Sequence, residues 1–146
     1  EQKAKELGYK TVILTDRFQS EAKFAGKKLI DQTPPNTILL AGGETTVKVT
    51  KKGKGGRNQE LVLGALDEID QNTLIASFDT DGWDNTEAAG AIGDFLTLQK
   101  AKELSMDPKH FLDENSSFSF FEKVEDGILT GHLPSNVSDL MIVIKK

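Results

Sequence analysis

The stretch KGKGGRNQELVLGAL, residues 52–66, begins as a glycine-rich loop and continues as a helix. Three glycines in four positions permit backbone conformations, and a close approach to a ligand, that larger residues prevent. Apolar residues then recur at the spacing of one helical face, at Leu61, Val62, Ala65, Leu66 and Ile69. The spacing therefore predicts a helix whose first turn is the polar segment 57–60.

The junction of this loop with the helix favours an anion. The first N–H groups of a helix have no partners within it, and they lie at the positive end of the helix dipole. Lys52, Lys54 and Arg57 add three cations at the same place. A phosphate or a carboxylate is thus the predicted ligand, and a solvated basic turn is the alternative explanation.

Apolar runs on both sides of the helix predict strands. Their continuous apolar and β-branched composition is typical of strands buried on both faces, at residues 11–15, 37–41, 73–78 and 140–144. Residues 46–50 alternate between apolar and polar side chains, which predicts a half-exposed strand.

Helices are expected between and after these strands. Capping residues or helical spacing place them after Ser20, over 95–104, after Asp107-Pro108 and after Asn115-Ser116. The small residues at 85–92 predict a further short helix. This alternation of strands and helices predicts one α/β domain over residues 1–146, with three α/β/α layers and a mixed, mostly parallel sheet.

Composition limits the classes of protein that fit. The 146 residues suffice for one hydrophobic core, and a net charge of −5 argues against a nucleic-acid partner. No apolar run approaches the roughly 20 residues of a membrane-spanning helix. Because there is no cysteine, disulfides are excluded and a cytoplasmic location is expected. The opening EQKAKELG reads as the tail of an amphipathic helix ended by Gly8, so we expect a fragment of a larger protein.

Three carboxylates follow the strand at 73–78, in the segment DTDGWD. In open α/β sheets, ligands bind beyond the carboxyl ends of strands, which makes this segment a candidate site. Asp79, Asp81 and Asp84 could hold Mg²⁺ together with phosphate oxygens, or one could accept a proton from a substrate hydroxyl. A turn with solvated carboxylates is the alternative.

A second polar loop, GGETT at residues 42–46, also follows a predicted strand. Its N–H groups and hydroxyls could line an anion site, although a tight turn explains the loop equally well. Asn136 and Asp139 could hydrogen-bond a ligand or form a turn before the last strand. The glycine motifs of phosphate loops and dinucleotide sites do not occur, and His110 and His132 are too isolated to predict a metal site.

Together these motifs resemble the C-terminal, or MOFRL, domain of class II glycerate kinases. The matching segments, in the family's order, are GGETTV (42–47), KGGRNQEL (54–61), TDG (80–82), EAAGA (87–91) and NVSDL (136–140). Each motif alone is weak, but five in order make the match specific, and the similarity covers nearly the whole chain.

The resemblance implies a two-domain enzyme that transfers the γ-phosphoryl group of ATP to D-glycerate, usually giving 2-phosphoglycerate. This chain would form one wall of the active-site cleft, and the larger N-terminal domain would be absent. Arg57 and Asp81 match the family's active-site arginine and aspartate, and Asp81 is also the expected Mg²⁺ ligand. The other residues expected to bind substrate or phosphate are Gly43, Glu44, Thr45, Gly55, Gly56, Asn58, Thr80, Asp84 and Asn136. A homodimer is compatible with this organisation.

Two loops depart from the family's pattern. Residues 85–87 are one residue shorter than the family's Gly-Pro-Thr-Asp, and GHLPSN at 131–136 replaces Gly-Pro-Thr-Gly-Thr-Asn. Both changes bear on ligand contacts and on the identity of the substrate. Two other functions therefore stay open: an oxidoreductase acting on hydroxypyruvate, a label that relatives often carry, and a regulatory anion-binding module without catalysis.

Overall fold

One six-stranded sheet organises the molecule, which is described here from a computed structural model of residues 1–146. The strands are β1 (Lys10–Phe18), β2 (Thr37–Gly43), β3 (Thr73–Asp79), β4 (Gly90–Gly93), β5 (Gly127–Ile128) and β6 (Asp139–Lys145). Their order across the sheet is β1-β2-β6-β3-β4-β5. The last strand of the chain therefore lies in the middle of the sheet, between β2 and β3.

The sheet is mixed, as the sequence predicts, but it is not mostly parallel. Only β1 and β2 pair in parallel, while β6 is antiparallel to both β2 and β3. The β3–β4 and β4–β5 pairs are antiparallel as well. The prediction of a mostly parallel sheet was wrong because β6 inserts between two strands that share a direction, and the alternation of strands and helices does not reveal this insertion.

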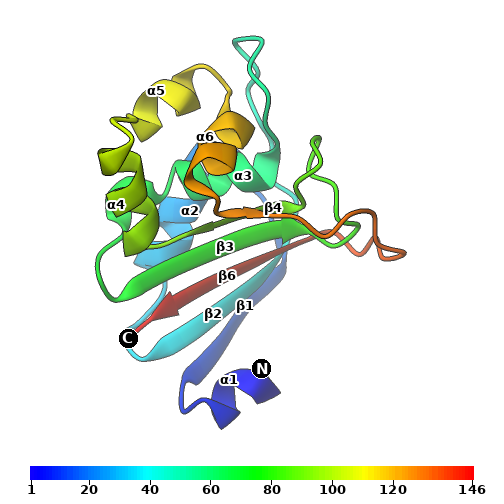
Figure 1. Ribbon diagram of the computed structural model, residues 1–146. Coiled ribbons are helices and arrows are strands. Elements are labelled where there is room, and N and C mark those ends of the chain that lie inside the picture. Colours follow the sequence, from blue (N-terminus) through cyan, green and yellow to red (C-terminus); the bar gives the residue numbers. More distant parts are fainter.

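Helices cover one face of the sheet. They are α2 (Ala22–Asp31), α3 (Arg57–Leu63) with the 3₁₀ turn η1 (Leu66–Glu68), α4 (Phe95–Glu103), α5 (Pro108–Asp113) and α6 (Ser117–Val124). Figure 1 shows them gathered above the sheet, whereas α1 (Gln2–Glu6) lies across the sheet from them. No helix has the length and apolar character needed to span a membrane. The α/β class is confirmed, but the predicted third layer is reduced to α1.

The core fills the space between the sheet and these helices. Leu39 of β2 and Ile75 of β3 belong to one apolar cluster with Leu61 of α3 and Phe120 of α6, and all four are fully buried. Helix α3 is central to this layer, since it contacts α2, β3, β4 and α6. The position of α3 matters for function because its first residue is Arg57.

Several predicted helix ends are confirmed. The carboxylate of Asp94 accepts the N–H groups of Leu96 and Thr97 at the start of α4, and the Thr97 hydroxyl accepts the Asp94 N–H in return. Asp107 caps α5, whose first residue is Pro108. These local signals depend only on neighbouring residues, which is why the sequence reveals them.

Other predicted elements do not form. Residues 46–50 make only a single bridge, from Thr46 to Glu21. The helix predicted at 85–92 does not form, because residues 85–89 are bends and residues 90–92 belong to β4. Strand β1 forms, but it is not buried on both faces as predicted, since Ile13 is 64% exposed. The reason is that β1 lies at the edge of the sheet.

The contact between α2 and α3 gives a test of the fold. Gly26 of α2 lies against α3, and a methyl group there would stand 2.5 Å from the Leu61 carbonyl oxygen and 2.6 Å from Ala65 Cβ. Gly26→Ala is therefore expected to lower the free energy of unfolding by about 1–3 kcal/mol, measured by chemical denaturation. Gly127→Ala is the control, since nothing lies within 4 Å of a methyl group at that position. Equal stability of the two variants would contradict this account of the packing.

Candidate active site

The ends of three central strands meet at one edge of the sheet. Strand β2 ends at Gly43, β3 ends at Asp79, and the antiparallel strand β6 begins at Asp139. In the register of the sheet, Asp139 pairs with both Gly43 and Asp79. The loops that carry the predicted motifs therefore leave the sheet side by side, although they are far apart in the sequence.

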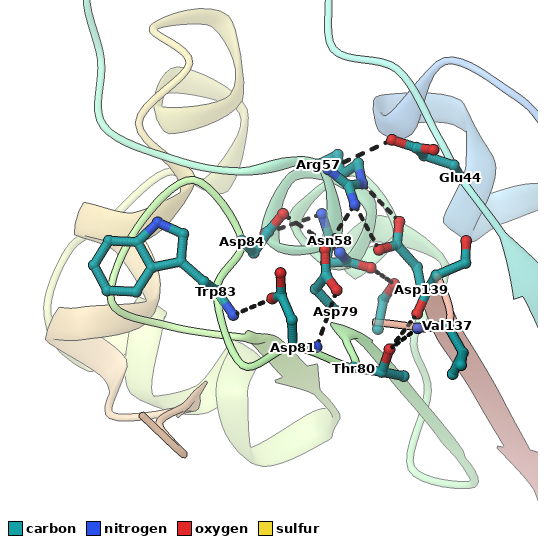
Figure 2. A network of polar contacts seen from close by, with 12 residues as sticks. Glu44, Arg57, Asn58, Asp79, Thr80, Asp81, Trp83, Asp84, Val137 and Asp139 are labelled. Atoms are coloured by element: carbon teal, nitrogen blue, oxygen red, sulfur yellow. Dashed lines mark hydrogen bonds and ion pairs between the residues drawn. The ribbon is translucent and has the colours of Figure 1, made fainter. Parts of the chain in front are cut away.

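Arg57 is fixed at this edge by two carboxylates. Its Nε and Nη2 atoms donate to the two oxygens of Asp139 at 2.7 and 2.9 Å, and Nη2 also donates to Asp79 at 2.7 Å. Figure 2 shows this network, with Glu44 on the other side of the guanidinium, 3.8 Å from Nη1. Asp79 and Asp139 thus position Arg57, and its Nη1 end is left facing Glu44.

The pKa values of Arg57 and Asp79 are both shifted by the charges of this cluster. The pKa of Arg57 is raised by the hydrogen bonds that it donates to Asp139 and by the nearby carboxylates, so the guanidinium stays charged. The pKa of Asp79 is raised, first by its burial and then by the negative charges of Asp139 and Asp81, against the opposing effect of Arg57. One cation therefore lies among several carboxylates, and the site as a whole is acidic.

The start of helix α3, predicted to bind an anion, is already occupied by one from the protein. One oxygen of Asp84 accepts the N–H groups of Asn58 and Gln59, both at 3.0 Å, and the Gln59 side chain at 3.0 Å. Burial raises the pKa of Asp84, while these hydrogen bonds lower it. The helix terminus does attract an anion, as the glycine loop indicates, but the anion is an internal carboxylate.

Asn58 and Asp84 are therefore enclosed. Both side chains are fully buried, and Asn58 also accepts a hydrogen bond from Ser77 at 2.5 Å. The hydrogen bonds of both side chains go to the protein, and Asp84 also lines the hollow beside Arg57, so a direct contact with substrate or phosphate stays a prediction. The sequence could not distinguish a ligand-binding asparagine at a helix start from one that holds a neighbouring loop.

The side chain of Thr80 holds the loop after β3 against the segment that precedes β6. Its hydroxyl donates to the Ser138 carbonyl oxygen at 2.9 Å and accepts the Val137 N–H at 3.0 Å. The Ser138 hydroxyl in turn donates to the Gly43 carbonyl oxygen at 2.6 Å. Thr80 and Gly43 thus tie the loops together in this structure, while the side chain of Asn136 is exposed and makes no hydrogen bond.

Asp81 is only partly buried, whereas Asp79, Asp84 and Asp139 are buried. One oxygen accepts the Trp83 N–H at 2.8 Å, and the Asp81 N–H donates to Asp79 at 3.2 Å. Trp83 also stacks on His132, with ring centroids 4.7 Å apart, beside this loop. No group of three or more acidic or histidine side chains is arranged to hold a metal ion by itself. A Mg²⁺ bound by Asp81 would therefore need oxygens from a ligand and water.

A hollow of about 510 Å³ lies beside Arg57. It brings together predicted site residues from three segments of the chain, namely Glu44, Thr45, Gly55, Gly56, Arg57 and Asp84. The hydroxyl of Thr45 is buried there without a hydrogen-bond partner. Among the lining residues that were not predicted as site residues are Glu60 and Asn115.

Asn115 organises the wall of this hollow. Its side-chain oxygen accepts the N–H groups of Thr50 and Lys51 at 2.8 and 3.0 Å, and its amide donates to Glu60 at 3.2 Å. The glycine loop is thus held by a residue 64 positions later in the chain. Because this contact is long-range, no local sequence signal reveals it.

The structural role of Asp84 can be tested by replacing its carboxylate with an amide. Asp84→Asn leaves one acceptor oxygen and brings an N–H₂ group against the Asn58 amide, so the free energy of unfolding is expected to fall by about 1–3 kcal/mol. Asp81→Asn is the control from the same loop, with an expected change within about 0.5 kcal/mol because the amide oxygen can still accept the Trp83 N–H. Unchanged stability of Asp84→Asn, measured by denaturation, would show that Asp84 does not hold α3.

The burial of Glu60 can be tested through the pH dependence of folding stability. Burial is the main cause that raises its pKa, so the folded chain holds this proton more tightly than the unfolded chain. Charging Glu60 therefore costs folding stability as the pH rises from the unfolded pKa through the folded one. Glu60→Gln removes this cost and keeps the acceptor for Asn115. Its stability relative to the wild type is expected to increase from about pH 4 upward, and a constant difference would contradict the assignment.

Comparison with known proteins places this geometry in a family. The chain is 39% identical to glycerate 2-kinase of Pyrococcus horikoshii, over 97% of this chain and 35% of that protein. It is 36% identical to D-glycerate 2-kinase of Thermotoga maritima, over 95% of this chain and 36% of that protein. The chain thus spans about a third of the length of the curated relatives it matches.

A solved structure and a family profile point to the same group of proteins. The crystal structure of glycerate kinase from Thermotoga maritima superposes with a TM-score of 0.89 at 35% identity, covering 98% of this chain and 38% of that one. The sequence profile described as the MOFRL family matches residues 37–139, which include every loop of the candidate site. Since the profile matches more than half of the chain, the chain belongs to the MOFRL family.

Proposed function

We propose that this chain is the C-terminal domain of a glycerate kinase and supplies one wall of an active site between two domains. The observation that carries the proposal is that Arg57, at the start of α3, and Asp81, on the loop after β3, lie at one edge of a fold shared with a glycerate kinase. The second wall would come from an N-terminal domain, which the greater length of the relatives supports.

Arg57 would stabilise negative charge during the transfer of the phosphoryl group. Its Nε and Nη2 atoms are held by Asp139 and Asp79, so the guanidinium does not have to be ordered when the substrate binds. Arg57 lines the hollow, where its guanidinium would meet a phosphoryl oxygen or the carboxylate of glycerate. Arginine suits this role because its fork of N–H groups matches both anions.

Asp81 would act on the hydroxyl of glycerate or on a metal ion. A carboxylate within reach of the hydroxyl can accept its proton as the oxygen attacks the γ-phosphorus of ATP. Its partial exposure also fits a Mg²⁺ ligand that shares the ion with phosphate oxygens and water. Mg²⁺ would neutralise charge on the phosphates when bound.

The triphosphate of ATP would not bind at the start of α3. Asp84 already fills that position, and a second anion there would be repelled by a buried carboxylate. We therefore assign the main ATP contacts to the N-terminal domain and the glycerate side of the cleft to this chain. A cytoplasmic location is part of the proposal because ATP is supplied there.

The activity can be measured with the intact protein, ATP, Mg²⁺ and D-glycerate. Arg57→Ala is expected to lower kcat/KM by about 10²–10³-fold, because charge on the transferred group loses its partner. Asp81→Asn is expected to lower it by about 10²–10⁴-fold, because the amide cannot accept a proton. Lys102→Ala and Asp113→Asn, on exposed positions of α4 and α5, are the matched controls and should leave kcat/KM unchanged.

Three outcomes would redirect the proposal. Full activity in both site variants would refute the roles of Arg57 and Asp81. Oxidation of NADH with hydroxypyruvate, without consumption of ATP, would favour an oxidoreductase. No turnover, together with a higher melting temperature in glycerate or phosphate, would favour a regulatory anion-binding module.

A further inference from the structure

The turn that carries Asp81 lies against a segment that comes much later in the chain. Asp81 follows strand β3, whereas residues 131–133 lie shortly before β6. The Leu133 N–H donates to the Asp81 carbonyl oxygen at 2.7 Å, which joins the two segments directly. Both leave the sheet at the same end, because Asp79 pairs with Asp139 where β3 ends and β6 begins.

The two segments pack without space for a side chain between them. Gly82, the residue after Asp81, has a φ of +86°, and a methyl group there would collide with the Gly131 carbonyl oxygen. Glycine alone adopts this conformation freely and allows so close an approach. The shape of the turn at residues 81–83 therefore depends on its contact with the segment 131–133.

The side chains of Trp83 and His132 join the same two segments. Their rings are stacked, with centroids 4.7 Å apart and planes inclined by 13°. Trp83 is 41% exposed and His132 is exposed too, so the pair lies at the surface and adds nothing to the hydrophobic core. A stacked aromatic pair is stabilising beyond the area that it buries. This pair therefore fixes the turn against the segment before β6.

The carboxylate of Asp81 depends on this turn more than its neighbours do. Asp84 is held by the first turn of α3, and Asp139 by Arg57. The side chain of Asp81 instead accepts the N–H of Trp83, from within the turn itself, at 2.8 Å. Its direction is thus set by residues 81–83, whose own shape is set by residues 131–133.

We propose that Trp83 and His132 are positioning residues that hold the carboxylate of Asp81 in its working direction. The inference rests on the proposed function, because it takes Asp81 to act on the substrate hydroxyl or on a metal ion. Without the stack, the turn would separate more often from the segment 131–133, and the carboxylate would spend less time in place. Small displacements of a reacting group lower the rate steeply, so the loss belongs in kcat and not in KM.

Hydrogen exchange of the intact protein, read by mass spectrometry of its peptides, tests the stack without an assay of activity. His132→Ala removes the ring, whereas His132→Phe keeps a ring that can stack on Trp83. Peptides that contain residues 80–84 are expected to exchange about 3–10-fold faster in His132→Ala and at the wild-type rate in His132→Phe. His110→Ala is the matched control, since this exposed histidine lies on α5. Unchanged exchange in His132→Ala, or equally fast exchange in His132→Phe, would overturn the proposal.

Glycerate phosphorylation by the same variants tests the link to Asp81. His132→Ala is expected to lower kcat about 10-fold with KM changed by less than about 2-fold, while His132→Phe and His110→Ala stay near the wild type. In an Asp81→Asn background, His132→Ala should cause no further loss, because it acts through the carboxylate that is already gone.

The contrary outcomes are distinct. Losses that add in the double variant, or unchanged kcat in His132→Ala, would overturn the positioning role while the kinase activity of the wild type stands. A wild type that does not phosphorylate glycerate would instead refute the proposed function, and with it the catalytic purpose of the stack. The exchange rates alone would then decide whether Trp83 and His132 fix the turn.

Discussion

The carboxylate of Asp84 at the start of α3 is the contact on which the site depends. It joins the loop after β3 to the first turn of the helix, through two backbone N–H groups and the side chains of Asn58 and Gln59. Because Arg57 is the residue just before these, its direction is set by the same junction. The charge satisfies a helix terminus that would otherwise be buried without partners. The glycine loop can then pass close by, since a side chain on Gly56 would collide with Asp84.

Around this junction, negative charge exceeds positive charge. Glu44, Asp79 and Asp139 share one guanidinium, and Asp81 lies on the adjoining loop. Such an arrangement orients the arginine more than it strengthens its net attraction for anions, because its charge is already largely compensated. Anionic substrates would bind more strongly here if a divalent cation or further cations from another domain came with them. This electrostatic balance agrees with the proposal that a second domain completes the site.

Much of the fold, and less of the site, could be predicted from the sequence. The four long apolar strands and the capped helices depend on local composition, and they appear where expected. The start of α3 at Arg57 and the preference of that place for an anion were also correctly predicted. The sequence did not predict that this anion is Asp84, because Asp84 lies 26 residues beyond Asn58. The insertion of β6, the clamp from Asp139 and the anchoring of the loop by Asn115 are likewise long-range contacts, and periodicity carries no information about them.

The central position of β6 has a consequence for how the chain is made. Strands β2 and β3 are not joined to each other but only through β6, whose residues 139–145 are synthesised long after theirs. During translation the two halves of the sheet would wait with unpaired edges until the last strand leaves the ribosome. The helical layer can collapse earlier, because its contacts are formed by residues already present. Completion of the sheet therefore depends on pairing β2 with β6, two strands that lie far apart in the sequence.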